Sequence, residues 1–68
     1  MEAIRKLYSK MNMDENSIQD DMKNNYLSEC IARNGKKVWW YLDNERCGAI
    51  YEDTLEMLTE EEVENELC

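Results

Sequence analysis

The run Lys37–Leu42 constrains the fold more than any other stretch of the chain. It contains Val, Trp, Trp, Tyr and Leu in succession, and β-branched and aromatic residues favour strands. Asn34 and Gly35 precede it, and an Asn-Gly pair between two strand-like runs indicates a hairpin, because both residues tolerate positive φ. After a turn over 43–46, Cys47–Tyr51 returns as another strand. The sequence therefore predicts a short antiparallel meander.

The segment Tyr26–Arg33 admits two interpretations. As a strand it would pair with the central run, with Ile31 opposite Val38 and Leu27 opposite Leu42. As a helix it would end at the Asn-Gly pair, which suits a helix C-terminus. We favour the strand because a two-stranded sheet alone is marginal. The meander accordingly has two or three strands.

Helical patterns occupy the N-terminal third. Residues 3–12 carry an apolar stripe at helical spacing, formed by Ile4, Leu7, Tyr8 and Met11. A second helix begins near Asp14 or Ser17, where Ser17 and Asp20 have the spacing of a capping box.

The last predicted helix begins at Thr59, which forms a capping box with Glu62. Val63 and Leu67 face inward from it. The fold class is therefore α+β: one or two N-terminal helices, the short meander, and a C-terminal acidic helix. A chain of 68 residues forms one small domain, residues 1–68.

Charge narrows the possible partners. The chain has 16 acidic and 8 basic residues, and residues 49–68 contain eight acids and no base. The remaining residues balance to zero, so this segment equals the net charge of −8. Such an excess argues against direct binding to nucleic acid or anionic membranes, and it favours a basic protein partner. No run approaches a membrane span and no signal peptide is present, which predicts a cytoplasmic protein.

Catalytic and metal-binding patterns are not found. The chain has no His and no Gly-rich phosphate loop, and Cys30, Cys47 and Cys68 lack the paired spacing of a zinc site. We therefore expect a non-enzymatic protein with no catalytic residues, no metal and no cofactor.

The aromatic run supplies one candidate interface. Strand alternation puts Trp39 and Tyr41 on one sheet face and Trp40 on the other. Either one face stays partly exposed and binds a partner through Trp39 and Tyr41, or helices cover both faces and all three are core.

The acidic segment supplies the other candidate interface. On one helix, Glu56, Glu60 and Glu64 would recur about every 6 Å, as a row of charge resembling a phosphate backbone. The alternative is a solvated polar face that confers solubility. The candidate partner-binding acids are Glu52, Asp53, Glu56, Glu60, Glu61 and Glu64.

These features predict an acidic binding protein that occupies a basic, nucleic-acid-binding surface of another protein. Over its whole length the chain resembles, in size and charge though in no motif, bacteriophage and mobile-element inhibitors of host defence such as anti-CRISPR and anti-restriction proteins. The resemblance implies a nucleic-acid mimic acting in the host cytoplasm. The alternative is a small assembly subunit that forms homo-oligomers through its Trp/Tyr-rich sheet.

Overall fold

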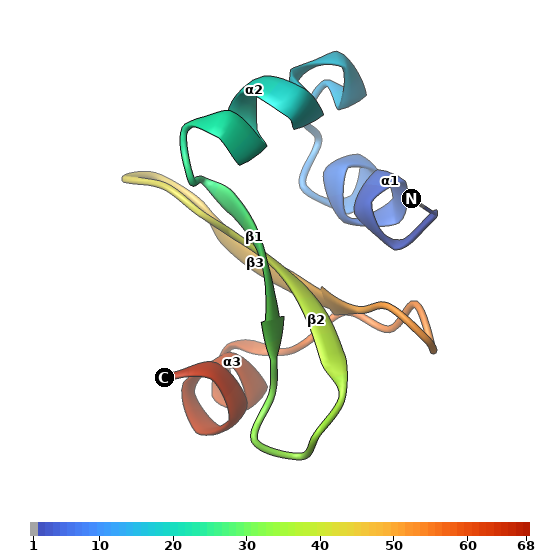
Figure 1. Ribbon diagram of the computed structural model, residues 1–68, viewed down its shortest axis with the longest axis vertical. Helices are drawn as coiled ribbons and strands as arrows, with labels where there is room; N and C mark the ends of the chain where they lie inside the picture. The colour runs from blue at the N-terminus through green and yellow to red at the C-terminus, as the bar shows by residue number, and fades with distance from the viewer. Residues whose placement is uncertain (1) are drawn as a thin grey trace.

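The computed structural model describes residues 2–68 and shows an α+β arrangement, as the sequence predicted. Two N-terminal helices and a short 3₁₀ turn precede a three-stranded antiparallel sheet, and a helix follows it (Figure 1). The elements are α1 (Glu2–Lys10), η1 (Glu15–Ser17), α2 (Ile18–Lys23), β1 (Leu27–Ile31), β2 (Lys37–Leu42), β3 (Cys47–Tyr51) and α3 (Glu60–Leu67). In the described part of the chain, no helix combines the length and apolar character needed to cross a membrane.

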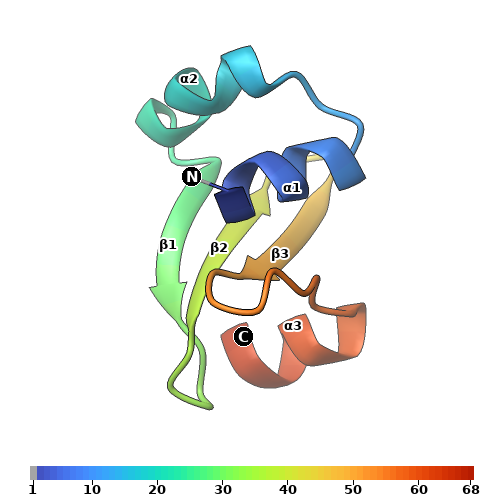
Figure 2. The same ribbon diagram turned by 90° about the vertical axis from the view of Figure 1, so that its right-hand side faces the viewer.

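Helices cover both faces of the sheet. The strand order is β1-β2-β3 (Figure 2), with α1 and α2 on one side and α3 on the other (Figure 1). Each side has its own apolar core: α1 and α2 pack with Leu27, Tyr41 and Ile50, whereas α3 packs on a core that includes Val38 and Ala49. The structure therefore shows the alternative in which both faces are covered.

Alternation places the two tryptophans in different cores, as predicted. Trp39 packs against the core beneath α1 and α2, and Trp40 packs against the core beneath α3. Both side chains are half-buried. Neither sheet face therefore presents a fully open aromatic surface.

The segment from Leu27 to Ile31 is a strand, which confirms the interpretation we favoured. The predicted register was wrong by one residue: Ile31 lies opposite Lys37 rather than Val38, and Leu27 lies opposite Tyr41 rather than Leu42. A slip of one residue transfers every side chain to the other face. The corrected register puts Leu27 in the core under α1 and α2.

The β1–β2 turn explains the register. The N–H of Gly35 donates to the carbonyl of Ala32 at 2.9 Å, and the N–H of Ala32 donates to the carbonyl of Lys36 at 2.9 Å. The loop therefore has three residues, and within it Gly35 (φ 89°) has the positive φ. A three-residue loop of this kind needs one left-handed residue at its end, whereas the predicted two-residue turn needs two.

The second helix begins where the sequence predicted, since the 3₁₀ turn follows Asp14 and α2 follows Ser17, but its cap differs from the prediction. Ser17 makes no capping hydrogen bond from its side chain, so the proposed capping box with Asp20 is wrong. Instead Asp14 caps the 3₁₀ turn, where its Oδ1 accepts the N–H of Asn16 at 2.9 Å. The Ser17 hydroxyl donates to the Asp14 carbonyl at 2.7 Å.

The capping box of α3 is confirmed. Thr59 Oγ1 accepts the N–H of Glu62 at 3.1 Å, and Glu62 Oε1 accepts the N–H of Thr59 at 3.1 Å. Val63 and Leu67 pack against the second core, as expected for the inward face.

Candidate functional site

The acids of α3 divide into those that hold the fold together and those that face solvent. Glu62 closes the capping box at Thr59, and Glu66 Oε1 accepts the N–H of Asn34 at 2.9 Å, which ties α3 to the β1–β2 turn. None of the hydrogen bonds or ion pairs within residues 2–68 involves the carboxylates of Glu60, Glu61 and Glu64, and all three are exposed.

The predicted three-carboxylate row is shorter than expected. Glu56 lies outside α3, in an extended segment that pairs with the outer side of β3. The Glu56 carbonyl accepts the N–H of Tyr51 at 3.0 Å. Only Glu60 and Glu64 remain on one helical stripe, with a rise of about 6 Å between them.

Both of these glutamates border a cavity between α3 and β3. Its volume is about 280 Å³, and Gly48, Leu58 and Val63 supply much of its lining. Glu60 and Cys47 also border an adjoining open hollow of about 610 Å³ beneath the β2–β3 turn. The exposed acids therefore stand at the rim of a partly apolar depression.

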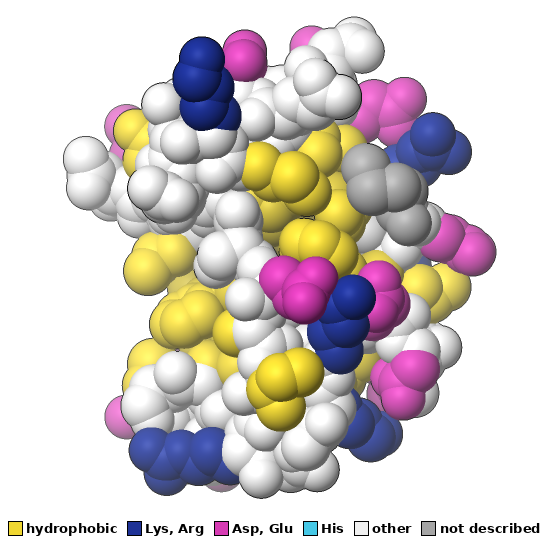
Figure 3. All heavy atoms as spheres, viewed as in Figure 1, with side chains coloured by type: hydrophobic (Ala, Val, Ile, Leu, Met, Phe, Trp, Pro, Cys, Tyr) yellow, Lys and Arg dark blue, Asp and Glu magenta, His cyan; other side chains and the backbone are white. Residues whose placement is uncertain are grey.

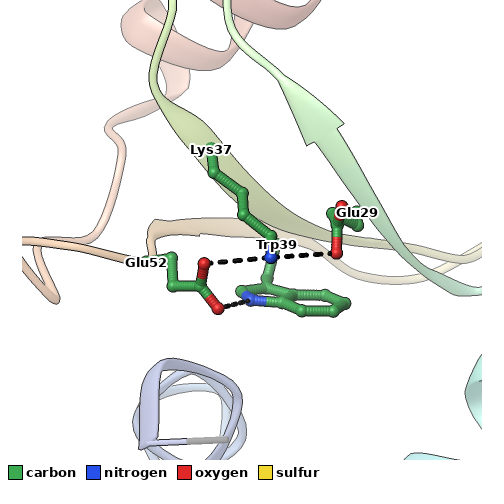
Figure 4. Close-up of polar contacts among 4 residues, drawn as sticks. All are labelled: Glu29, Lys37, Trp39 and Glu52. Carbon is green, nitrogen blue, oxygen red and sulfur yellow. Dashed lines mark hydrogen bonds and ion pairs between the residues drawn. The ribbon is translucent and has the colours of Figure 1, made fainter.

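Glu52 belongs to a polar cluster on the other side of the sheet (Figure 4). The Lys37 ammonium lies 3.1 Å from a Glu52 oxygen and 3.2 Å from a Glu29 oxygen. The Trp39 indole N–H donates to the other Glu52 oxygen at 3.2 Å. Lys37 balances part of this negative charge, so Glu52 serves the fold and contributes little to a free acidic surface.

The pKa values in this cluster follow from its contacts. The hydrogen bonds to Glu52 and then Glu29 raise the pKa of Lys37. The hydrogen bonds from Lys37 and then Trp39 lower the pKa of Glu52. Lys37 and Glu52 therefore keep their charges through neutral pH, and their contacts fix the orientation of the Trp39 ring.

Tyr41 lies in the core rather than on a binding surface. Its side chain is 5% exposed, and its ring meets the ring of Tyr8 edge to face at 5.9 Å. The Tyr41 hydroxyl donates to Asp43 Oδ2 at 2.6 Å. The prediction that Tyr41 shares an exposed face with Trp39 is wrong, because α1 packs over that face.

Asp53 is exposed in the loop after β3, where its Oδ1 accepts the N–H of Thr54 at 2.7 Å. The structure thus separates the predicted acids into three places: Glu52 in the polar cluster, Asp53 and Glu56 in the loop, and Glu60, Glu61 and Glu64 on α3.

Sequence reasoning missed a group of exposed apolar side chains. Tyr26, Ile31 and Leu42 are 44%, 65% and 50% exposed. Ile31 is the last residue of β1 and Tyr26 directly precedes the strand. The N–H of Leu42, on β2, donates to the Tyr26 carbonyl at 2.8 Å. The correct register of the hairpin was the signal that could have revealed them.

No family model, no curated protein and no solved structure matches the chain. The proposed function therefore rests on the sequence and the structure.

Within residues 2–68, no group of three or more Cys, Asp or Glu side chains could hold a metal ion. The cysteines are free thiols, and burial raises the pKa of Cys30.

Proposed function

We propose that the chain is a non-enzymatic acidic binding protein that occupies a basic, nucleic-acid-binding surface of another protein. The observation that supports this most is the set of exposed carboxylates on α3. Glu60, Glu61 and Glu64 are exposed, take no part in the folding contacts of the described residues, and stand beside a partly apolar depression. A surface rich in arginine or lysine would complement the negative charge of these glutamates.

The exposed carboxylates of α3 should act mainly on the rate at which the chain associates with its partner. A one-sided field steers a protein toward a surface of opposite sign, and salt weakens the effect as the Debye length shortens. Single exposed charges contribute little. The proposal therefore concerns the set of α3 carboxylates together with Asp53 and Glu56, rather than any one of them.

The kind of partner follows from the whole chain. Small size and strong acidity favour an inhibitor that competes with nucleic acid, of the class that phages and mobile elements direct against host defence nucleases. Anti-CRISPR and anti-restriction proteins are the nearest functional types, and they act in the host cytoplasm. The alternative assembly subunit loses its proposed Trp/Tyr interface, because α1 packs over the sheet face that carries Tyr41.

Two matched variants test the proposal. The α3 variant replaces Glu60, Glu61 and Glu64 with Gln, and the helix control makes Glu2→Gln, Glu15→Gln and Asp20→Asn on the N-terminal elements. Each removes three negative charges from exposed positions, so their net charges are equal. Circular dichroism and thermal unfolding check that both are folded.

Wild type and both variants are immobilised and exposed to a bacterial lysate, and captured proteins are identified by mass spectrometry. We expect wild type and helix control to capture the same nucleic-acid-binding protein and the α3 variant to capture less of it. Added wild-type chain should displace nucleic acid from that purified protein. Equal capture by both variants, or a partner that keeps its nucleic acid, would contradict the proposal.

A further inference from the structure

The two edges of the sheet differ. The outer side of β3 is covered by the segment after it, where the Leu58 N–H donates to the Ala49 carbonyl at 3.0 Å and Ile50 bridges Met57. The outer side of β1 has no neighbouring strand within residues 2–68. In Figure 1 this edge faces the viewer, with β1 in front of β2.

Antiparallel pairing settles which backbone groups point outward. The Tyr26 carbonyl accepts from Leu42, and the Ala32 N–H donates to Lys36, so these residues point toward β2. Backbone groups alternate in direction along a strand, which turns those of Leu27, Glu29 and Ile31 away from β2. Three N–H and three C=O groups are thus arranged as the template for a further strand.

Apolar surface lies beside this template. Among the described residues, Tyr26, Ile31 and Leu42 are the exposed large hydrophobic side chains, and each lies on β1, directly before it, or paired with its start. Figure 3 shows this side of the molecule, where hydrophobic side chains reach the surface. A docked strand would lie beside Ile31, the last residue of β1, while its backbone completes the hydrogen bonds of the edge. Tyr26 and Leu42 lie near the β2–β3 turn, at the other end of β1.

A second copy of this chain fits the edge poorly. The antiparallel register that pairs all five residues of β1 with a second β1 is centred on Glu29, so two Glu29 side chains would lie opposite one another. Like charges directly opposite destabilise a strand pair. Each copy also carries a net charge of −8. The Glu29 carboxylate instead complements a cation, since its side chain is half exposed although it contacts Lys37.

We propose that the free edge of β1 binds an extended segment of another protein by strand addition, with a Lys or Arg opposite Glu29 and an apolar residue opposite Ile31. Main-chain hydrogen bonds supply the affinity in this mode, and alternate side chains supply the specificity. The inference does not depend on the α3 carboxylates, so it stands or falls separately from the proposed function.

Three capped peptides serve as probes. The first is Thr-Ile-Thr-Lys-Thr-Ile-Thr, which sets Lys opposite Glu29 and Ile opposite Leu27 and Ile31. The second replaces Lys with Glu. The third carries N-methyl groups on Lys and both Ile residues, which removes the donors that face β1. Binding is followed by NMR, together with amide hydrogen exchange of wild-type protein.

We expect the Lys peptide to slow exchange at the outward amides of Leu27, Glu29 and Ile31. At nine-tenths occupancy the slowing is about tenfold, because only the free fraction exchanges. The inward amides of Ser28 and Cys30 are already bonded to β2 and should change little. The N-methylated peptide should not bind.

Glu29→Lys should weaken binding of the Lys peptide by at least about twofold, the range of a cross-strand ion pair, and strengthen binding of the Glu peptide. Glu64→Lys is the matched control, because it makes the same change in net charge on α3. Equal weakening by both variants, binding of the N-methylated peptide, or protection spread evenly over β1 would overturn the proposal. So would a dimer of the chain alone that protects the same outward amides.

Discussion

At the scale of single residues, the neighbouring tryptophans differ in how their indole N–H groups are satisfied. The Trp39 N–H donates to Glu52, and the Lys37 ammonium lies 5.4 Å from the centroid of its ring. The Trp40 N–H is buried and has no hydrogen-bond partner in residues 2–68. An unpaired buried donor costs about 1–3 kcal/mol, so Trp40 holds a penalty that Trp39 does not.

Replacing each tryptophan with Phe exposes this difference. Trp39→Phe loses a hydrogen bond to a charged group, whereas Trp40→Phe loses only ring area and removes the unpaired donor. We expect Trp39→Phe to lower the free energy of unfolding by about 1 kcal/mol more than Trp40→Phe. Urea denaturation followed by circular dichroism measures both values. A larger loss in Trp40→Phe than in Trp39→Phe would contradict this expectation.

Asp43 gives a pH-dependent prediction. The hydrogen bond from Tyr41, and then that from the N–H of Glu45, lower the pKa of Asp43. A lowered carboxyl pKa stabilises the fold above the ordinary value near 4, and that contribution is lost as pH falls through the lowered pKa. Asp43→Asn should therefore show a shallower loss of thermal stability on acidification than wild type. Parallel acid profiles for the two proteins would contradict this.

The hydrogen bond between Tyr41 and Asp43 also affects stability at alkaline pH, because it raises the pKa of Tyr41 whereas it lowers that of Asp43. The hydrogen bond to Asp43, followed by burial, raises the pKa of Tyr41 to about 12. The protonated phenol is favoured in the folded state, so its contribution is complete below about pH 10 and is lost as pH rises through about 12. Tyr41→Phe should remove part of the alkaline loss of stability, measured by thermal unfolding across that range. An unchanged alkaline profile would rule out this contribution.

At the scale of elements, the cap of α3 lends itself to a simple test. Thr59→Ala removes the acceptor for the Glu62 N–H and should cost about 1 kcal/mol of stability. Thr54→Ala is the control, because Thr54 Oγ1 accepts from Glu56 at 3.3 Å in a loop outside any helix. Thermal unfolding should show a lower midpoint for Thr59→Ala than for Thr54→Ala. Equal midpoints would mean that the cap contributes nothing measurable.

The helices and strands could be predicted from the sequence, because the pattern that marks each element lies within a few neighbouring residues. The aromatic run gave β2, and the Thr59 capping box gave the start of α3. The register of β1 could not be predicted from the Asn-Gly pair alone, because the pair fits loops of two or three residues and only the three-residue loop buries Leu27. Which sheet edge stays open also depends on where the segment after β3 folds back.

At the scale of the whole molecule, the fold decides which of the acidic side chains remain free to meet a partner. The sequence located the excess acids within residues 49–68 but could not show which were free. Glu52 is balanced by Lys37, and Glu62 and Glu66 hold α3 in place. The remaining carboxylates concentrate on one helix and the loop before it. The structure therefore places the candidate acids on α3, in the loop before it and, for Glu52, in the polar cluster, and their role in binding stays a prediction.

The central claim is that the α3 carboxylates guide the chain onto a basic surface, and association kinetics test it most directly. Stopped-flow rates with the captured nucleic-acid-binding protein are compared for wild type, the α3 variant and the helix control as salt is raised. Wild type and the helix control should associate fastest at low salt and slow steeply with added salt. The α3 variant should associate several-fold more slowly at low salt, with a shallower slope. A folded α3 variant with the rate and salt dependence of wild type would contradict the account.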